Sequence, residues 1–463
     1  MNLLDTVAAI STPYGKGGVA IIRISGNEAI EIAQRVFMCA NGNSLCDMPS
    51  AKMTYGHIFM PHDISKTGID DGMAVVFRAP HSFTGENTVE ISCHGGILVT
   101  QKVLSAVLCA GARSAEAGEF TRRAYINGKF RLSEAEALGQ LLEAKSDSQL
   151  ALARCGMNGK LSDKIDGIYS KLLEVMSSIY ASIDFPEEDL AEMSREEMLS
   201  EIGNIQGQIQ KLAATYSTGR AVTEGIPTVI CGRTNAGKSS VYNRILGHDA
   251  AIVTDVAGTT RDVLRETAIV GKTTLLLCDT AGIRNTDDVV ENIGIERSMN
   301  EIKNAGLVIA VFDGAKSPTE DDEEFVKVAL SQGVSSIALI NKSDIVSDEK
   351  YREICKDFDK TLLVSALTGE GFETLATTID EMFIDGSIDM NNDAVVTGVR
   401  QFAALNNALQ LLDKTLIDMK NGMSLDACCV QVECAMSSLG EVDGREIGEE
   451  IVSQIFSRFC VGK

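Results

Sequence analysis

The sequence has no apolar stretch long enough to cross a membrane, which takes about 18 uncharged apolar residues in a helix. The segment from Met1 to Thr12 also lacks a basic run ahead of an apolar one, the pattern typical of a secretory leader. None of the 12 cysteines forms a C-x-x-C pair, so neither a zinc ribbon nor a disulfide framework is predicted. We therefore expect no membrane association and a cytoplasmic protein with reduced thiols.

Basic residues are scarce: the chain has 42 Lys and Arg against 65 Asp and Glu, a formal net charge of -23 at pH 7. A surface of that charge repels phosphate backbones, so RNA must be held by a local basic patch or by another protein. The densest basic run consists of Arg113, Arg122, Arg123, Lys129 and Arg131. Charge patterning alone leaves open whether this run is a binding patch or a solvated surface segment.

Internal repeats and low-complexity tracts are also lacking, and 463 residues predict about three domains. Residues 1–120 alternate glycine clusters with short β-branched runs at Val19–Ile24, Met73–Phe77 and Val89–Ile91. This alternation indicates a small α+β domain.

Helical periodicity dominates residues 121–220 and returns in residues 386–463. Apolar side chains share a helical face at Ile165, Ile168, Leu172, Val175, Ile179 and Ile183, at Met198, Ile202, Ile205, Ile209 and Leu212, and at Phe402, Leu405, Leu409, Leu412 and Leu416. Ser133 with Glu136, and Ser194 with Glu197, have the spacing of a capping box at a helix start. We expect both blocks to form one discontinuous helical bundle, into which residues 221–385 are inserted.

Residues 221–385 alternate apolar strands with helices. The strands are predicted at Thr228–Cys231, Leu275–Leu277, Leu307–Phe312 and Ile337–Ile340, each short and apolar enough to be buried in a parallel sheet. A doubly wound α/β domain results. The predicted fold class is thus multidomain, α+β and α/β, with a Ras-like P-loop G domain inserted in a helical domain.

A glycine-rich segment, Gly232-Arg-Thr-Asn-Ala-Gly237-Lys238-Ser239, follows the first of these strands and precedes a helical stretch. This is the context of a phosphate-binding loop, whose backbone amides point at phosphate oxygens. Lys238 would place a cation on the phosphates, and Ser239 would offer a hydroxyl to Mg²⁺. The segment predicts a P-loop nucleotide site.

Two later segments are expected to complete the phosphate side of the site. Asp279-Thr-Ala-Gly282 ends the next apolar strand, where the Asp279 carboxylate can hold the metal shell and Gly282 can meet the γ-phosphate. Thr260 lies between the motifs and is predicted as a second hydroxyl ligand of Mg²⁺. Because loss of the γ-phosphate would release the segment after Gly282, the order of motifs predicts a switch.

The base is expected to be guanine. Asn341-Lys342-Ser-Asp344 follows a strand, and the Asp344 carboxylate can accept from both N–H groups of guanine, a donor pair that adenine lacks. Ser365 and Ala366, after the next strand, fit a backbone contact to the guanine oxygen. The set favours GTP over ATP.

Catalysis needs a water-positioning group and a positive charge near the phosphates, yet the glutamine that positions water in many GTPases is missing after Gly282. The amide oxygen of Asn235 and carbonyls around Thr254 and Val256 could hold a monovalent cation. Residue types alone leave open whether Asn235 is simply a loop residue. Glu291 is an acidic candidate for orienting the water.

Three segments together resemble the MnmE (TrmE) family: Asn235-Ala-Gly-Lys-Ser-Ser240, Thr254-Asp-Val-Ala-Gly-Thr-Thr-Arg-Asp262 and Cys460-Val-Gly-Lys463. The similarity to that family's N-terminal domain is carried by Asp5–Pro13, Gly17–Gly26, Ser82–Glu86, His94–Gly96, Gly118–Thr121 and Asn127–Lys129. The resemblance therefore runs the length of the chain.

This resemblance implies a homodimer whose N-terminal domains pair constitutively and whose G domains pair across GTP, Mg²⁺ and K⁺. It implies Glu291, Lys238 and Asn235 as catalytic residues, with Mg²⁺ at Ser239 and Thr260. K⁺ would be held by Asn235, Thr254, Val256 and Thr259. The nucleotide contacts it implies are Asn235, Ala236, Gly237, Lys238, Ser239, Ser240, Thr254, Asp255, Val256, Ala257, Gly258, Thr259, Thr260, Asp279, Thr280, Ala281, Gly282, Asn341, Lys342, Asp344, Ser365 and Ala366.

The family resemblance also implies that 5,10-methylenetetrahydrofolate or 5-formyltetrahydrofolate binds the N-terminal domain at Arg23, Glu86, Lys129 and Lys463. Cations suit the glutamate tail of a folate, and a carboxylate can accept paired N–H groups of the pterin. The alternative is that Arg23 and Glu86 are ordinary polar residues that hold the fold. Cys460 would lie near the pocket, either reactive or as an inert thiol.

The partner that the family implies is a flavoprotein, MnmG (GidA), in a heterotetramer or larger complex that modifies C5 of the tRNA wobble uridine with an aminomethyl or carboxymethylaminomethyl group. The acidic chain would contact tRNA mostly through that partner. Phe130 and Arg131 depart from the leucine and aspartate usual after Lys129, a change that bears on the folate contacts and not on the fold.

Other readings are a ribosome-assembly or iron-transport GTPase, since these share the cation-binding asparagine, or a folate-dependent one-carbon enzyme with a structural G domain. An iron transporter needs membrane helices, and an assembly factor usually has a basic RNA-binding domain. Intact Lys238, Ser239 and Asp279 argue against a merely structural G domain.

Overall fold

The structure is a computed structural model that describes residues 5–61, 68–184, 193–247, 265–278, 302–345, 350–445 and 448–462. The chain forms two compact units. The first comprises Met1–Gly139, Met157–Ile165 and Met436–Lys463, and the second comprises Gln140–Gly156 and Asp166–Ala435. These units divide the chain differently from the predicted segments 1–120, 121–220, 221–385 and 386–463, whose boundaries stay predictions.

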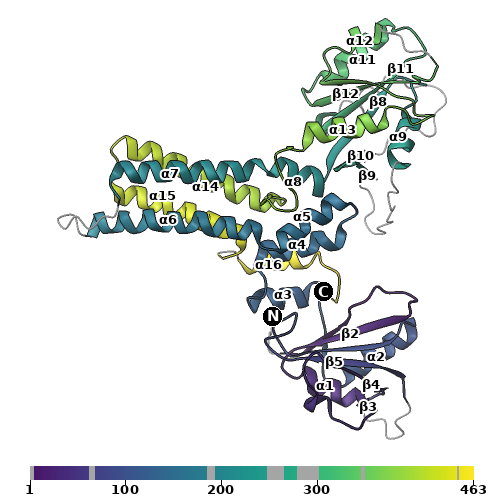
Figure 1. Cartoon of the computed structure of the whole chain (residues 1–463), viewed down its shortest axis with the longest axis vertical. Coiled ribbons are helices and arrows are strands. Elements are labelled where there is room, and N and C mark those ends of the chain that lie inside the picture. The colour runs from purple at the N-terminus through teal and green to yellow at the C-terminus, as the bar shows by residue number, and fades with distance from the viewer. Residues whose placement is uncertain are drawn as a thin grey trace. The chain divides into compact units, whose positions relative to one another are not determined.

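A seven-stranded sheet forms the N-terminal part of the first unit (Figure 1). In spatial order its strands are β3 (Phe37–Cys39), β4 (Met53–Ile58), β5 (Asp70–Phe77), β6 (Thr88–His94), β2 (Val19–Ser25), β1 (Val7–Ile10) and β7 (Arg113–Ser114). Only the β1–β7 pair is parallel among these seven strands. The strands predicted around Val19, Met73 and Val89 are confirmed.

The two faces of this sheet have different roles. Helices α1 (Ala29–Val36) and α2 (Ile97–Cys109) pack against the strands, where Ile22 and Ile24 of β2 are fully buried in the main core. Because successive strand residues point to opposite faces, Arg23 and Ser25 lie together on the other face. That second face carries the polar groups discussed below.

Helices complete the first unit. Helix α3 (Glu119–Ile126), the start of α4 (Leu132–Glu143) and α16 (Glu449–Phe456) follow the sheet, and a small apolar cluster joins Leu132 and Ala135 to Val452 and Phe456. The C-terminal segment then returns to the sheet: Ala117 and Val461 form an antiparallel bridge, and the Ser11 Oγ donates to the Gly462 carbonyl over 3.0 Å.

The predicted capping box at Ser133 is wrong. Helix α4 already begins at Leu132, and the Glu134 carboxylate accepts from the Arg131 amide over 3.0 Å. The Ser133 hydroxyl is buried and instead donates to Asp443 Oδ1 over 3.0 Å. The hydroxyl that local spacing predicted as a helix cap is thus bonded to a carboxylate 310 positions away in the sequence.

The second unit contains long helices that run beside one another: α7 (Arg195–Ala214), α14 (Val399–Lys420) and the larger parts of α6 (Lys160–Asp184) and α15 (Leu425–Asp443) (Figure 1). Helices α5 (Asp147–Met157) and α8 (Tyr216–Thr223) accompany them. The Ser194 capping box is confirmed, because Glu197 N donates to Ser194 Oγ and Ser194 N donates to the Glu197 carboxylate.

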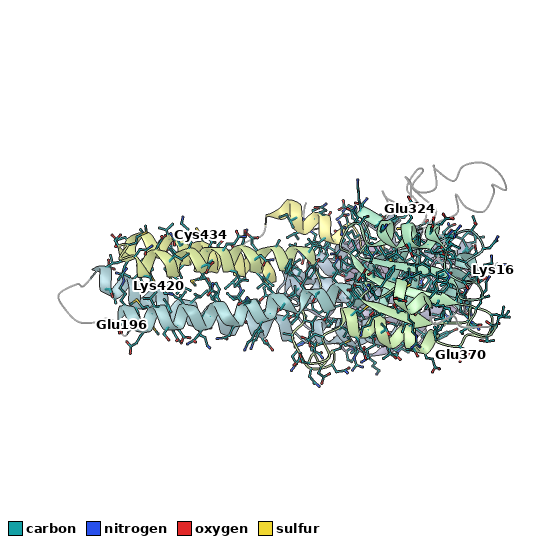
Figure 2. The ribbon with its side chains drawn as sticks, turned by 90° about the horizontal axis from the view of Figure 1, so that it is seen from above. Lys16, Glu196, Glu324, Glu370, Lys420 and Cys434 are labelled. Atoms are coloured by element: carbon teal, nitrogen blue, oxygen red, sulfur yellow. The ribbon has the colours of Figure 1, made fainter. Side chains whose placement is uncertain are left out.

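Helices α7 and α14 are antiparallel. The Arg195 guanidinium at the start of α7 donates to the carbonyl of Met419 near the end of α14 over 2.9 Å. Figure 2 accordingly shows Glu196 and Lys420 at the same end of the bundle. The predicted apolar faces are largely buried, with Phe402, Leu409 and Ile183 only half-buried.

The rest of the second unit is an α/β domain with a six-stranded sheet. Its spatial order is β13 (Lys360–Leu363), β12 (Ser335–Asn341), β11 (Leu307–Asp313), β8 (Ile226–Gly232), β10 (Thr273–Cys278) and β9 (Arg265–Val270). The parallel pairing of β8, β10, β11 and β12 confirms the prediction, whereas the antiparallel edge strand β9 was not predicted.

Apolar cores cover both faces of this sheet, as a doubly wound domain requires. Helices α9 (Lys238–Gly247), α11 (Glu320–Leu330), α12 (Lys350–Ile354) and α13 (Phe372–Phe383) connect or flank the strands. The mixed helical and sheet architecture expected from the sequence is therefore confirmed.

Candidate functional site: a nucleotide pocket and a polar sheet face

The glycine-rich loop connects strand β8 to helix α9. Strand β8 ends at Gly232 and α9 begins at Lys238, so the loop faces the carboxyl ends of the parallel strands. Asn235 and Gly237 have positive φ values of 63° and 95°. A side chain at Gly237 would place its Cβ 2.2 Å from Asn341 Nδ2, so only glycine fits there.

Asn341 connects this loop to the segment at Ser365 and Ala366, which the sequence predicts as a contact to guanine. Its Nδ2 donates to the Ala236 carbonyl and its Oδ1 accepts from the Ala366 amide, each over 3.0 Å. The side chain is 2% exposed. Asn341 therefore uses both ends of its amide to fix two loops that sequence motifs had predicted separately, and the Ala366 amide predicted for guanine is engaged with Asn341.

Lys342 forms a second connection between the same regions. Its Nζ donates to the Asn235 carbonyl over 3.1 Å and to Asp313 Oδ2 over 2.8 Å. Burial opposes ionisation of Asp313, yet the hydrogen bond from Lys342 brings the pKa of this carboxyl below its ordinary value. Asp313 was missed by the sequence reasoning, although its place at the end of β11 was a usable signal.

The carboxylate predicted to read guanine is oriented in advance. The Ser365 hydroxyl donates to Asp344 Oδ1 over 2.6 Å, and Ser365 Oγ accepts from the Thr368 amide over 3.2 Å. Asp344 thus has one oxygen held by its own chain and one that can accept from a base.

Lys238 is satisfied by the loop itself. Its Nζ donates to the Arg233 carbonyl over 2.8 Å, and burial lowers the pKa of its ammonium. The Arg233 side chain, another residue that sequence reasoning missed, pairs with Asp321 over 2.7 Å and donates to Thr319 Oγ1 over 2.6 Å. The loop is thereby tied to the start of helix α11.

The other predicted phosphate and metal residues lie outside the described residues: Thr254, Asp255, Val256, Ala257, Gly258, Thr259, Thr260, Asp279, Thr280, Ala281, Gly282 and Glu291. Among described residues, Asn235, Ser239 and Ser240 are exposed, so their side chains are accessible to a ligand. No group of three or more His, Cys, Asp or Glu suited to a metal occurs in the described ranges. The amide, hydroxyl and carbonyl oxygens predicted here suit K⁺ and Mg²⁺.

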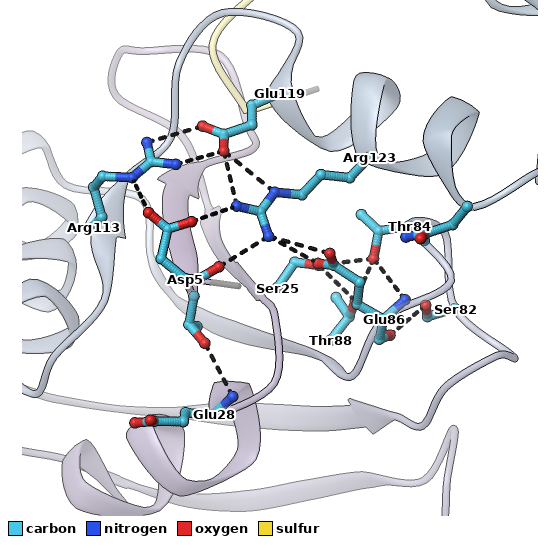
Figure 3. A network of polar contacts seen from close by, with 12 residues as sticks. Asp5, Ser25, Glu28, Ser82, Thr84, Glu86, Thr88, Arg113, Glu119 and Arg123 are labelled. Atoms are coloured by element: carbon cyan, nitrogen blue, oxygen red, sulfur yellow. Dashed lines mark hydrogen bonds and ion pairs between the residues drawn. The ribbon is translucent and has the colours of Figure 1, made fainter. Parts of the chain in front are cut away.

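The second candidate site is the polar face of the N-terminal sheet (Figure 3). Arg23 pairs with Glu90 over 2.8 Å, and its guanidinium lies 5.3 Å from the ring centre of Phe83 and 5.6 Å from that of Phe120. Phe130 packs on Phe83 with ring centres 5.7 Å apart. Phe130 therefore extends the aromatic cluster on which Arg23 lies.

Glu86 and Lys129 lie at the same face. Glu86 Oε2 accepts from the Ser25 hydroxyl over 2.8 Å, and Lys129 Nζ donates to the Pro80 carbonyl over 3.1 Å. The structure thus gathers Arg23, Glu86 and Lys129 around the loop that precedes β6, whereas Lys463 lies outside the described residues.

Part of the basic run also belongs to this face. Arg113 and Arg123 are engaged in ion pairs, and Arg123 is fully buried. Arg131 lies 3.7 Å from Asp443. Arg123 is therefore not part of a solvated segment, whereas the side chains of Arg113 and Arg131 remain more than one-third exposed. The thiol of Cys460 is exposed.

Known proteins resemble this chain over its whole length. The family model described as "GTP-binding protein TrmE N-terminus" matches residues 6–129, and "MnmE helical domain" matches residues 132–460. Three relatives carry the name tRNA modification GTPase MnmE. That of Geobacillus thermodenitrificans is 39% identical over 469 residues, covering 100% of both chains. Those of Ligilactobacillus salivarius and Lactococcus lactis subsp. cremoris are each 39% identical, covering 99% of this chain and 98% of theirs.

No helix within the described residues is both long and apolar enough to span a membrane.

Proposed function

The chain belongs to the MnmE (TrmE) family of tRNA modification GTPases, and from this premise we propose a specific reaction cycle. The protein acts in the cytoplasm as a homodimer with an MnmG-type flavoprotein. Together they install an aminomethyl or carboxymethylaminomethyl group at C5 of the tRNA wobble uridine. A tetrahydrofolate supplies the one-carbon unit, and K⁺-dependent GTP hydrolysis drives pairing of the G domains.

The observation that carries the proposal is the Asn341 bridge between the glycine-rich loop and the Ala366 segment. Through it, the phosphate side and the base side of the pocket are held in one arrangement. Asp344, oriented by Ser365, then presents a carboxylate oxygen suited to the two N–H donors of guanine. Discrimination against adenine follows, because adenine would leave that carboxylate unpaired.

The phosphate side supports hydrolysis. Lys238 begins helix α9, where the free backbone amides of the first turn favour an anion. Ser239 and Asn235 are exposed beside it, as ligands of Mg²⁺ and K⁺ must be before nucleotide binds. K⁺ held there would supply the positive charge that other GTPases take from an arginine. Glu291 orients the attacking water in this proposal.

The N-terminal face supports folate binding. Arg23 and Lys129 offer cations for the glutamate tail, while the Glu86 carboxylate can accept N–H groups of the pterin. In this proposal Asp344 and Glu86 play the same chemical part, because each carboxylate accepts N–H groups of a heterocyclic ring, guanine at Asp344 and pterin at Glu86.

The cation dependence is tested by measuring GTP hydrolysis in matched KCl and NaCl buffers. We expect hydrolysis to be several-fold faster in K⁺, and Asn235→Ala to abolish the difference. Gln332→Ala, which removes an exposed amide from the same domain, is the matched control and should keep the K⁺ preference. Equal rates of the unaltered protein in both salts would contradict the K⁺ proposal.

The reaction itself is tested on tRNA from cells that lack this chain. Nucleoside analysis should show wobble uridines without the C5 group, and expression of the intact chain should restore it. Lys238→Ala should fail to restore it. An unchanged nucleoside profile in the deletion strain would overturn the assigned reaction.

A further inference from the structure

Two arginines and two carboxylates close a ring at the polar face of the N-terminal sheet (Figure 3). Arg113 donates to Asp5 Oδ2 over 2.8 Å and to Glu119 Oε1 over 2.7 Å. Arg123 donates to the same two carboxylates, to Asp5 Oδ1 over 3.2 Å and to Glu119 Oε1 over 2.9 Å. The ring is electrically neutral, because each arginine is balanced by one carboxylate.

Arg123 is held in a single position within this ring. Its guanidinium has five N–H donors, and each has an acceptor. Nε and Nη2 donate to Glu119 and Asp5, and one Nη1 donor reaches the Asp5 carbonyl over 3.0 Å. The other Nη1 donor is shared by the two oxygens of Glu86, each 3.2 Å away. The side chain is 0% exposed, so its orientation is fixed by packing as well as by these bonds.

Glu86 stands outside the ring and brings a third carboxylate, which leaves one negative charge in excess. Its Oε2 accepts from Ser25 and Arg123, whereas Oε1 accepts from Arg123 alone within the described residues. The side chain is 15% exposed. Its backbone is also held, since Glu86 N donates to Thr84 Oγ1 and Glu86 O accepts from Ser82 Oγ. One carboxylate oxygen with spare acceptor capacity is therefore presented from a rigid support.

We propose that Arg123 is a positioning residue for ligand binding, which acts by holding the Glu86 carboxylate in place on the sheet face that also carries Arg23. This inference rests on the proposed folate function and extends it. The ligand class is a heterocycle with adjacent N–H donors, such as the pterin of a tetrahydrofolate. Arg123 itself is too deeply buried to touch the ligand.

The ring geometry separates this role from a purely structural one. Arg123 keeps its bonds to Asp5 and Glu119 if the Glu86 carboxylate is removed, so the ring does not need Glu86. Conversely, Glu86 has no bond to Arg113. A substitution at Arg113 therefore disturbs the ring but keeps the hydrogen bonds from Arg123 to Glu86. A substitution at Arg123 removes those hydrogen bonds.

The test is the affinity of the full chain for 5-formyltetrahydrofolate, measured by calorimetry. Arg123→Lys should weaken binding by roughly tenfold or more, because a lysine cannot reproduce the planar fork of donors. Arg113→Lys, the matched control in the same ring, should stay within about twofold of the unaltered chain, since it spares the charge-assisted bond to Glu86.

A double-mutant cycle then shows whether Arg123 acts through Glu86. In a Glu86→Gln background, Arg123→Lys should add less than about a twofold loss, since the group it positions is already gone. Additive losses, or equal losses from Arg123→Lys and Arg113→Lys, overturn the inference. Should the arginine variants fail to fold, Glu86→Asp withdraws the carboxylate from Arg123 and keeps its charge. Binding of Glu86→Asp at unaltered affinity would also overturn it.

Failure of the proposed folate function gives a different result. In that case the unaltered chain shows no calorimetric binding of 5-formyltetrahydrofolate while its GTP hydrolysis is intact, and the inference falls with it. Binding by the unaltered chain together with indifference to Arg123 leaves the folate function standing and removes only the positioning role.

Discussion

Replacing Gly237 by alanine tests the connection between the phosphate loop and the base-recognition segment. Gly237 has a φ of 95°, and an added Cβ would lie 2.2 Å from Asn341 Nδ2. The amide of Asn341 cannot yield without losing its hydrogen bonds to Ala236 O and from Ala366 N, because the side chain is 2% exposed. The substitution should therefore disturb both sides of the pocket at once.

The magnitude follows from two contributions. A left-handed backbone costs about 1–2 kcal/mol for a residue with a Cβ. Two hydrogen bonds are worth about 0.5–1.5 kcal/mol each. The sum, about 2–5 kcal/mol, is the expected loss in the free energy of unfolding. The hydrogen-bond share alone, about 1–3 kcal/mol, can appear in binding, and its lower end corresponds to a loss in GTP affinity of roughly fivefold.

Gly333→Ala is the matched control for the strain. Gly333 lies in the same domain with a φ of 63°, and no atom lies within 4 Å of its added Cβ. It should lower the free energy of unfolding by about 1–2 kcal/mol and leave GTP affinity unchanged. Binding of a fluorescent GTP analogue and thermal unfolding measure the two effects. If Gly237→Ala matches Gly333→Ala in both, the steric argument at Asn341 is refuted.

Two further predictions concern stability. Asp380→Ala removes the carboxylate that accepts from the turn between β9 and β10, and should lower the free energy of unfolding by about 1–3 kcal/mol, whereas its exposed neighbour Glu381→Ala should have little effect in the same thermal melts. Burial opposes ionisation of Glu119, but the hydrogen bond from Arg113 leads the contributions that bring its pKa below the ordinary value. A carboxyl whose pKa is lower in the folded chain stabilises the fold above its unfolded pKa of about 4.3, and this stabilisation is lost as the pH falls. Glu119→Gln should therefore make the melting temperature fall less steeply with decreasing pH. An equally steep fall in the variant and the unaltered chain would contradict this.

Features encoded within a few neighbouring residues could be predicted from the sequence. The strand–loop–helix around Lys238, the capping box at Ser194 and the buried parallel strands each depend on local spacing or on a continuous apolar run. Strand β9 was missed because its sequence, Arg265–Val270, mixes charged and apolar residues as an edge strand does. A continuous apolar run or a spaced motif was sufficient, whereas a strand of mixed polarity was missed even though its partner β10 follows it directly.

Features that depend on distant partners could not be predicted. Ser133 has the spacing of a helix cap, but Asp443 accepts its hydroxyl from the far end of the chain. Arg123 and Glu86 are separated by 37 positions, and charge patterning grouped Arg123 only with its neighbours in sequence. A hydrogen bond between residues so far apart leaves no periodic pattern in the sequence, so only the folded structure shows it.

The two sides of the candidate nucleotide site differ in how favourably the chain's own contacts already satisfy their polar groups. On the predicted base side, Asn341 and Asp344 are already held by hydrogen bonds within the chain, so we expect a base to bind there with little reordering. On the phosphate side, Lys238 is half-buried, its pKa is lowered by burial, and it donates to a neutral carbonyl at Arg233. Exchange of that carbonyl for a phosphate oxygen replaces a neutral acceptor with a charged one and relieves the unfavourable burial of the ammonium. We therefore expect the electrostatic gain on nucleotide binding to fall mainly at the phosphates, and the pre-arranged base side to determine which nucleotide binds.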